Sequence, residues 1–369
     1  MLMLWPLKKV AIVTLLAASC TGIFLYTVNS ILRTEPDILA DAGLTPGGTN
    51  RQLYSSLSSS QEERFDNDLH DYLDDAVFSS SDSLNRTVHF VKIYSSAPNK
   101  ASNSSCWVEC LSLLSVMLYI NPEYVYLHTN YPDFWPFEPC QATITKWPKL
   151  RIVPVQRRFI MGGKVITFIE HQADMVKLYS VYKYGGIAMD FDVFLLPRLK
   201  DLLPTIQSKY ECIVSKEYSY LNLGLIGCRK DSEYIAEILD KYVTDYRPSE
   251  WVYNSGRTPW KIYYTGKYQE RVYVDDEISN KPDYDRRNVM LQQRGIINWM
   301  QKTGFHSYAH ASPFSMCSLT ELTLPAMKSS FADMLLFILN DGRLAGLVDR
   351  PVTTAPLMYK KTVLENLVF

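Results

Sequence analysis

The sequence predicts an α/β fold in which a mixed sheet is flanked by helices. Two observations support this prediction. Short segments rich in β-branched and aromatic residues alternate with longer apolar segments of helical spacing, and the helical segments end at glycine or Asn-Pro signals. With 369 residues, 47% of them hydrophobic, the chain can also bury a sizeable core, as one large domain or two modest ones.

The folded part is expected to begin with a strand at Val88–Tyr94, where β-branched and aromatic residues are dense. Cys106–Tyr119 follows as an apolar helix, which Asn121-Pro122 ends. Tyr124–Leu127 and Leu150–Val155 are two further strands by the same criteria. Strands and helices in this order indicate a sheet whose connections lie over its faces.

A second long helix is expected at Ile169–Tyr184, before Gly185-Gly186 breaks it. Ile187–Met189 then forms a short strand that leads directly into Asp190-Phe191-Asp192. Ligands of open α/β sheets bind at the carboxyl ends of the strands, so this acidic pair lies where a ligand site is expected. The later run Phe331–Leu339 indicates a core or interface helix, too short to span a membrane.

The N-terminal region predicts a membrane anchor. Residues 10–32 contain no charged side chain, and a helix needs about 20 apolar residues to cross a bilayer. Lys8 and Lys9 precede this run, which predicts a cytosolic tail at residues 1–9 and a lumenal body. The alternative is a cleaved signal peptide, because Ala17-Ala18-Ser19 resembles a cleavage site. The apolar run continues past that site and favours the anchor.

Residues 33–86 predict a flexible stem, because serine tracts, Pro46-Gly47-Gly48 and an acidic run follow one another there. Residues 34–84 hold eleven acidic and two basic side chains, while the whole chain has a formal net charge of −1. The body at 87–369 is therefore mildly basic. That charge suits an anionic small substrate, and we expect no nucleic-acid partner.

The cysteines favour disulfides in an oxidising compartment. One of the seven, Cys20, lies in the predicted anchor, and an even number remains for the body. A zinc site at Cys106 and Cys110 is disfavoured, because no second Cys/His pair follows at zinc-site spacing. The sequons at Asn85 and Asn103 agree with a lumenal body. The six remaining cysteines are Cys106, Cys110, Cys140, Cys212, Cys228 and Cys317.

Asp190 and Asp192 are the candidate metal ligands. Carboxylates between apolar flanks are costly unless they are paired or metal-bound. At positions i and i+2 of a strand end they can point to one side and offer hard oxygen ligands to Mn²⁺ or Mg²⁺. Such an ion also binds substrate phosphates and neutralises the charge on a departing diphosphate.

The run from Ala173 to Asp192 resembles the sugar-binding region of glycosyltransferases that contain a DXD motif. This group includes OCH1-type mannosyltransferases, α-1,4-galactosyltransferases and the glucosylating clostridial toxins. The resemblance implies a GT-A fold, which is a Rossmann-like mixed sheet, a UDP- or GDP-sugar donor, and Mn²⁺ or Mg²⁺ as the metal. The residues in register with the motif are Ala173, Asp174, Val181, Gly185, Gly186, Asp190 and Asp192.

The resemblance also implies residue roles. Asp192 would bind the metal with the donor diphosphate, and Asp190 would lie by the metal and the ribose and sugar hydroxyls. Asp174 and Lys177 would hold the donor sugar, with Gly185 and Gly186 in the same cofactor-binding region. Lys177 stands where the family has arginine, and Ala188 where it has an aromatic residue. For Asp174 and Lys177 the alternative is an exposed helix pair.

Later residues complete the candidate site. Asn222 resembles the family's sugar-facing asparagine and is a candidate catalytic residue, the alternative being a strand-end turn. His310, in one segment with His306, resembles the late histidine that closes on the metal. Asp275-Asp276-Glu277 could supply an acceptor-facing carboxylate, although such runs are usually solvated. Aromatic residues that could stack on sugars are Trp251, Tyr253, Trp260, Tyr263, Tyr264 and Tyr268.

We therefore predict a metal-dependent type II membrane glycosyltransferase of the Golgi or ER, which by resemblance retains anomeric configuration. The donor-binding part is 87–230, the acceptor-side part 231–330, and the C-terminal helix lies in 331–369. The expected acceptor is a glycan, glycoprotein or glycolipid. Two alternatives remain open: a lumenal glycan-binding protein of the same fold without turnover, and a metal-dependent phosphotransferase or hydrolase.

Overall fold

The computed structural model describes residues 83–84, 86–98, 106–134, 136–278, 289–295, 297–309 and 315–349. All of them belong to one compact unit, Asp66–Phe369. The predicted tail, anchor and most of the stem, as well as the asparagines of both sequons, lie outside these residues. Among the described residues, none of the helices combines the length and the apolarity that crossing a membrane requires.

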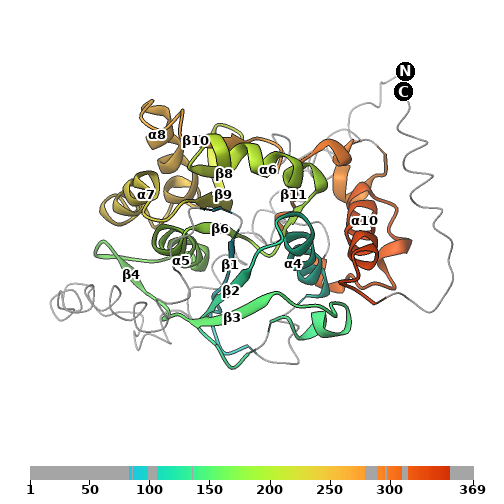
Figure 1. Cartoon of the computed structure of the whole chain (residues 1–369). Helices are drawn as coiled ribbons and strands as arrows, with labels where there is room; N and C mark the ends of the chain where they lie inside the picture. The colour runs from blue at the N-terminus through green and yellow to red at the C-terminus, as the bar shows by residue number, and fades with distance from the viewer. Residues whose placement is uncertain are drawn as a thin grey trace, which may run out of the picture. The chain divides into compact units, whose positions relative to one another are not determined.

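A seven-stranded mixed sheet forms the centre of this unit, in the order β10-β8-β9-β6-β1-β2-β3 (Figure 1). β6, β1, β2 and β3 run parallel to one another, whereas β9 is antiparallel to both β6 and β8. The predicted mixed α/β fold is confirmed. The strands are β1 Thr87–Lys92, β2 Tyr124–Thr129, β3 Lys149–Pro154, β6 Gly186–Met189, β8 Cys212–Glu217, β9 Tyr220–Cys228 and β10 Val272–Asp275.

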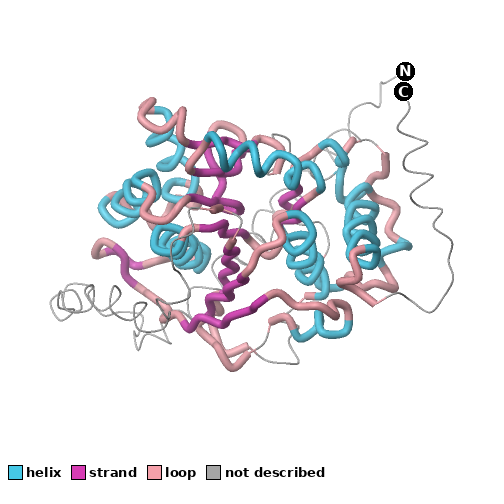
Figure 2. Tube along the Cα trace, in the orientation of Figure 1, coloured by secondary structure: helices cyan, strands magenta, loops and turns pink. Residues whose placement is uncertain are grey.

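Helices cover both faces of the sheet (Figure 2). On one face α5 and α7 bury a core that includes Ala188, and on the other α4 and α10 bury a core that includes Ile187 and Met189. Consecutive β6 residues thus point to opposite cores, as side chains along a strand do. The helices are α4 Trp107–Tyr119, α5 Ile169–Tyr184, α6 Pro197–Lys209, α7 Glu233–Thr244, α8 Thr258–Tyr264 and α10 Ser330–Leu344.

Shorter elements complete the unit, and one pair of them matters for the site. β11 pairs with β7 in an antiparallel two-stranded sheet, which brings the chain near residue 306 back beside the DXD motif. The short strands are β4 Ile160–Met161, β5 Lys164–Val165, β7 Val193–Leu195 and β11 Gly304–His306. The short helical turns are Glu138–Ala142, Tyr253–Arg257, Trp299–Gln301, Met316–Ser318 and Leu324–Ala326.

All six cysteines of the body form disulfides, as expected for an oxidising compartment. The pairs are Cys106–Cys317, Cys110–Cys140 and Cys212–Cys228. The first two fasten the N-terminal end of α4, and the third joins register partners of β8 and β9. Each bridge typically contributes about 2–4 kcal/mol to the free energy of unfolding.

Candidate active site

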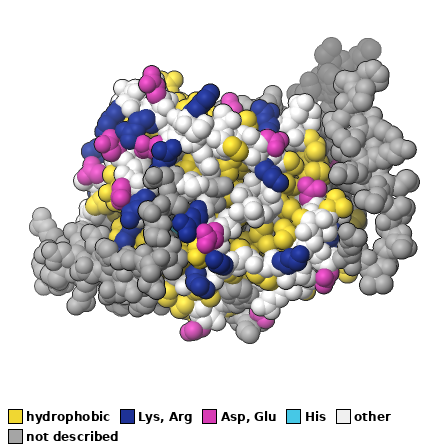
Figure 3. All heavy atoms as spheres, viewed as in Figure 1, with side chains coloured by type: hydrophobic (Ala, Val, Ile, Leu, Met, Phe, Trp, Pro, Cys, Tyr) yellow, Lys and Arg dark blue, Asp and Glu magenta, His cyan; other side chains and the backbone are white. Residues whose placement is uncertain are grey.

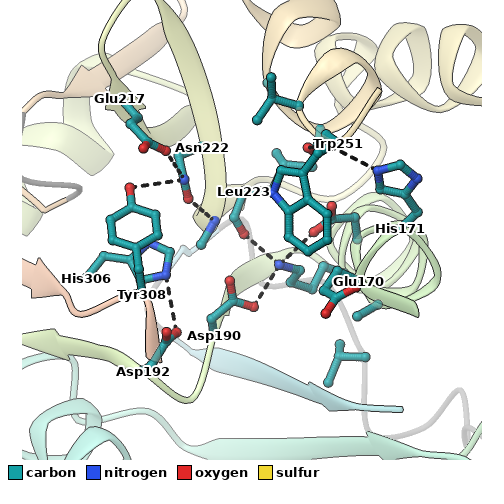
Figure 4. Close-up of a pocket in the computed structure, with 18 of the residues that line it drawn as sticks. Glu170, His171, Asp190, Asp192, Glu217, Asn222, Leu223, Trp251, His306 and Tyr308 are labelled. Atoms are coloured by element: carbon teal, nitrogen blue, oxygen red, sulfur yellow. Dashed lines mark hydrogen bonds and ion pairs between the residues drawn. The ribbon is translucent and has the colours of Figure 1, made fainter. Parts of the chain in front are cut away.

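A cavity of about 560 Å³ opens where β1 and β6 end. Its walls come from the end of β1, the first turns of α5, the residues after β6, the β8–β9 hairpin and the segment after β11 (Figure 4). The DXD motif directly follows β6 and lines this cavity. The cavity therefore lies at the strand ends where a ligand site was predicted.

Asp190, Asp192 and His306 form a candidate metal site. One ligand atom from each lies within 4.8 Å of the other two, the one such group among the residues the structure describes. Pairing of His306 with Val193 across β11 and β7 places the imidazole beside the motif. His306 Nε2 lies 3.2 Å from Asp192 Oδ1, and the backbone N–H of Ala309 donates to Asp192 Oδ2 at 2.7 Å.

The histidine that reaches the motif is thus His306. His310, which the sequence favoured as the ligand, lies outside the described residues. Burial disfavours the charged form of His306, but the Asp192 carboxylate outweighs this and raises its pKa.

Lys177 is the central cation of the cavity. Its side chain is 2% exposed, and Nζ contacts Asp174 Oδ1 at 2.8 Å, Asp190 Oδ1 at 2.8 Å and the carbonyl oxygen of Leu223 at 2.9 Å. Burial alone would lower the pKa of Lys177, but the two carboxylates raise it overall. The alternative interpretation, an exposed helix pair at Asp174 and Lys177, is wrong.

The charges around Lys177 do not cancel. Asp174 and Asp190 share the Lys177 ammonium, and the nearby Asp192 pairs with His306 instead. Three carboxylates against one lysine leave two negative charges for His306 or a bound cation to compensate. Burial raises the pKa of Asp190, and although Lys177 opposes this, the nearby Asp192 adds to it. On the face drawn in Figure 3, by contrast, basic and acidic side chains of the described residues are interspersed.

Asn222 lies on the opposite wall, in β9. Its Nδ2 donates to Glu217 Oε2 at 2.6 Å and to the Tyr308 hydroxyl at 3.3 Å, while Oδ1 accepts from the backbone N–H of Gly224 at 2.6 Å. A carboxylate on one side and an N–H on the other fix the orientation of the amide. A Cβ on Gly224 would lie 2.6 Å from both Asn222 Oδ1 and His306 Nδ1, so this position has no room for a side chain.

Gly185 and Gly186 end α5 and shape the start of β6. Both have positive φ, 69° and 99°, and a Cβ on Gly186 would lie 2.4 Å from the Thr87 carbonyl oxygen. The expected close backbone approach is present, but it is made to β1, and neither glycine lines the cavity. Ala188 is fully buried in the core beneath α5, so the missing aromatic residue leaves the cavity wall unchanged.

The residues proposed to face an acceptor are mostly elsewhere. Asp275 is buried and accepts hydrogen bonds from the Thr303 hydroxyl at 2.8 Å and the Ile278 N–H at 2.9 Å, away from the cavity lining. Of the six aromatic candidates, Trp251 alone lines the cavity. Its carbonyl oxygen accepts from His171 Nε2 at 3.0 Å, which anchors this wall to α5.

The comparison with protein families decides the class of this site. Residues 156–210 match the family described as glycosyltransferase sugar-binding region containing DXD motif. This stretch of the chain is similar to the DXD glycosyltransferases. The match includes Asp174, Lys177, Asp190 and Asp192, so the predicted resemblance is confirmed for these residues, and it supports the predicted enzyme class, a glycosyltransferase.

Individual relatives are distant. A stretch of 181 residues is 23% identical to glucan organizing enzyme 1 of Cryptococcus neoformans var. grubii serotype A, covering 47% of this chain and 48% of that protein. The chain thus spans about half the length of this curated relative. Similar solved structures include the glycosyltransferase GlyE of Streptococcus pneumoniae TIGR4, with 12% identity, 73% and 65% of the two chains covered and a TM-score of 0.38. An active-site mutant of LgtC has 11% identity, 74% and 99% coverage and a TM-score of 0.37.

Some residues of this DXD glycosyltransferase site were missed from the sequence. Glu217 is the last residue of β8, and Tyr308 follows β11, with no motif or spacing that links either residue to Asp190. The one available signal was the turn Glu217–Tyr220 between two strands, where exposed polar and aromatic residues often reach a ligand. Which residues contact a donor or an acceptor stays a prediction.

Proposed function

We propose that this glycosyltransferase moves a sugar from a UDP- or GDP-sugar to a glycan or glycoconjugate, and that it requires a divalent metal. The observation that carries the proposal is the excess of carboxylate charge around Asp190 and Asp192 beside a single buried lysine. A nucleoside diphosphate is itself anionic and would be repelled from such a cavity. A bound divalent cation matches the two uncompensated charges and reverses this repulsion.

Asp190, Asp192 and His306 would hold the metal, and the donor set fits Mn²⁺, which accepts oxygen-rich sites. When bound, the ion supplies Lewis-acid stabilisation of the departing diphosphate. The protein fixes the ligands beforehand. The N–H of Ala309 donates to Asp192 Oδ2 and Lys177 Nζ donates to Asp190 Oδ1, which fixes the orientation of both carboxylates.

Asp174 and Lys177 would position the donor sugar. Lys177 is immobilised by three acceptors, so it cannot follow the substrate and instead keeps Asp174 and Asp190 in one arrangement. A carboxylate oxygen can accept more than one hydrogen bond, so Asp174 and Asp190 suit the hydroxyls of a sugar. Asn222, oriented by Glu217, would face the same sugar from the other wall.

The cellular setting is part of the proposal. Three disulfides support an oxidising compartment, and the charge-free run at 10–32 behind two lysines supports a single-pass type II anchor in the Golgi or ER membrane. Retention of configuration follows from the resemblance alone. The acceptor would be a glycan, glycoprotein or glycolipid, and the name of the curated relative makes glucan one acceptor to include.

A donor panel tests the proposal. The purified chain is incubated with a series of UDP- and GDP-sugars, with and without Mn²⁺, and release of the nucleoside diphosphate is measured. We expect hydrolysis of at least one donor in the presence of Mn²⁺ and its loss with EDTA. If no donor is hydrolysed and no donor changes the thermal stability of the protein, the alternative of a glycan-binding protein without turnover is favoured.

A further inference from the structure

Two tyrosines of the cavity have an unusual backbone conformation. Among the described residues, four that are not glycine have positive φ: Asn121, Asp231, Tyr218 and Tyr308. Asn and Asp adopt this conformation readily, whereas for a bulky side chain it is an outlier. Both tyrosines line the cavity, and strained residues of this kind cluster at functional sites.

Tyr308 has a visible task within the protein. Its ring stacks on the His306 imidazole with 3.9 Å between centroids and 18° between planes, and its hydroxyl accepts from Asn222 Nδ2. The positive φ of 50° therefore holds a ring against a candidate metal ligand. This account leaves Tyr218 unexplained.

Tyr218 sits at the tip of the β8–β9 hairpin with φ of 49° and 38% of its surface exposed. The ring of Tyr220 is its aromatic neighbour, at 6.2 Å. A strained backbone that presents an exposed ring at the mouth of a cavity provides a flat apolar surface. The apolar face of a sugar ring stacks on such a surface.

Glu217 provides the polar half of the same site. One carboxylate oxygen, Oε2, accepts from Asn222 at 2.6 Å, which orients the group (Figure 4). The other oxygen, Oε1, accepts no hydrogen bond from the protein in the part of the chain that the structure describes, and the residue lines the cavity. A sugar hydroxyl can donate to this oxygen, and a charge-assisted hydrogen bond of this kind is strong.

The charge of the cavity restricts which sugars can bind. Six carboxylates line it against two lysines, and each lysine is already paired with one or two of those carboxylates. A divalent cation with a diphosphate adds no net positive charge to this balance. A sugar that carries a carboxylate of its own would meet Glu217 without a compensating cation. The carboxylates are Glu109, Glu170, Asp174, Asp190, Asp192 and Glu217.

We propose that Glu217, Tyr218 and Tyr220, at the tip of the β8–β9 hairpin, form the acceptor subsite and take an uncharged sugar. Tyr218 stacks on the apolar face of the sugar, and Glu217 Oε1 accepts one of its hydroxyls. This inference rests on the proposed transferase function, because only a transferase needs an acceptor beside its donor.

Binding of neutral and charged glycosides tests the subsite directly. Saturation-transfer NMR is recorded on the full chain with Mn²⁺ and UDP or GDP, using methyl glucosides, galactosides and mannosides as probes. Methyl β-glucuronide serves as the matched anionic probe, since it differs from the glucoside only at C6. We expect at least one neutral glycoside to bind and the glucuronide to bind about tenfold more weakly. Equal or tighter binding of the glucuronide overturns the proposal, and so does the absence of binding by every neutral probe.

Variants assign the effect to the hairpin. Tyr218→Ala should weaken glycoside binding about tenfold, and Tyr218→Phe should retain it. Glu217→Gln should reduce the difference in affinity between the glucoside and the glucuronide. A purely structural role of Glu217 would not change that difference. Tyr264→Ala is the control, because Tyr264 is 63% exposed and outside the cavity. If Tyr218→Ala binds the glycosides as tightly as Tyr264→Ala does, the subsite lies elsewhere.

The backbone strain at Tyr218 allows an independent test by thermal stability. Tyr218→Gly removes both the ring and the cost of positive φ, so thermal stability should hold or rise while glycoside binding falls. Donor hydrolysis by the unaltered chain, measured in parallel, distinguishes failure of the subsite proposal from failure of the proposed transferase function. Hydrolysis without any effect of the hairpin variants overturns only the subsite, whereas no hydrolysis of any donor overturns the transferase function itself.

Discussion

The two walls of the active-site cavity are built in different ways. The wall proposed to bind the donor, here called the donor wall, consists of Asp174, Lys177, Asp190 and Asp192. It comes from one stretch of chain and is held by buried ion pairs. The hairpin wall, Glu217 to Asn222, is joined to the distant Tyr308 by a hydrogen bond from Asn222 and carries a strained tyrosine at its exposed tip. The difference indicates a donor wall that tolerates little change and a hairpin wall whose exposed tip can vary with the acceptor.

Removing a metal ligand should give the largest effect. Asp192→Asn keeps the shape but replaces one negative oxygen with an amide, and we expect about a 100-fold or greater loss of Mn²⁺-dependent donor binding with the fold intact. Isothermal titration with Mn²⁺ and donor measures this. Asp201→Asn, at an exposed position on α6, is the matched control. Unaltered Mn²⁺-dependent turnover in Asp192→Asn would mean that the metal lies elsewhere.

The buried lysine tests whether charge holds the donor wall together. Lys177→Met fills a similar volume but leaves Asp174 and Asp190 without their ammonium, which should lower the free energy of unfolding by about 3 kcal/mol. Urea denaturation measures the loss. Lys200→Met, on the exposed face of α6, should change stability little. Equal stability of the two variants would contradict the description of this wall.

Acidification tests the scaffold beneath the donor wall. His89 and His128 are fully buried, with His89 Nδ1 3.0 Å from His128 Nε2, and His89 Nε2 donates to the carbonyl oxygen of Gly185. Burial lowers the pKa of His89 to about 4 and lowers that of His128 as well. The unfolded chain therefore binds more protons than the folded one, and stability falls once the pH drops below the unfolded pKa of about 6.5.

We expect about 2 kcal/mol or more to be lost between pH of about 7 and about 5. Unfolding curves across this range measure the slope. Replacing both histidines with a neutral isosteric pair, His89→Gln and His128→Gln, should flatten it. If the free energy of unfolding of the double variant still falls with pH to the same extent, the loss of stability comes from other titratable groups.

The smallest effect is expected where the two walls meet. Gly224→Ala would place a Cβ 2.6 Å from both Asn222 Oδ1 and His306 Nδ1, displacing Asn222 of the hairpin wall and the imidazole that contacts Asp192 of the donor wall. We expect about a tenfold loss of transfer with little loss of stability. Gly163→Ala is the control, because its Cβ would meet no atom within 4 Å although its φ is positive. Equal activity of both variants would show that the walls act independently.

Local sequence patterns predicted most of the fold. β1, α4, β2, β3, α5, β6 and α10 all lie within a few residues of their expected positions, because each is marked by periodicity or by a breaker such as Gly185. The grouping of Asp174, Lys177, Asp190 and Asp192 in one cavity was predicted as well, since these residues share one motif in a short stretch of chain. His306 could not be preferred over His310, because that choice depends on how β11 pairs with β7.

The sequence by itself determined which family the candidate site resembles: the spacing from Asp174 to Asp192, together with the double glycine, matches a DXD glycosyltransferase region. It also determined that the body would be disulfide-bonded. Only the tertiary structure decided the pairing of the cysteines, the burial of Lys177 between two carboxylates, and the meeting of Glu217, Asn222 and Tyr308. The physical reason is that spacing along the chain governs local contacts, whereas these depend on strand register and hairpin geometry between distant segments.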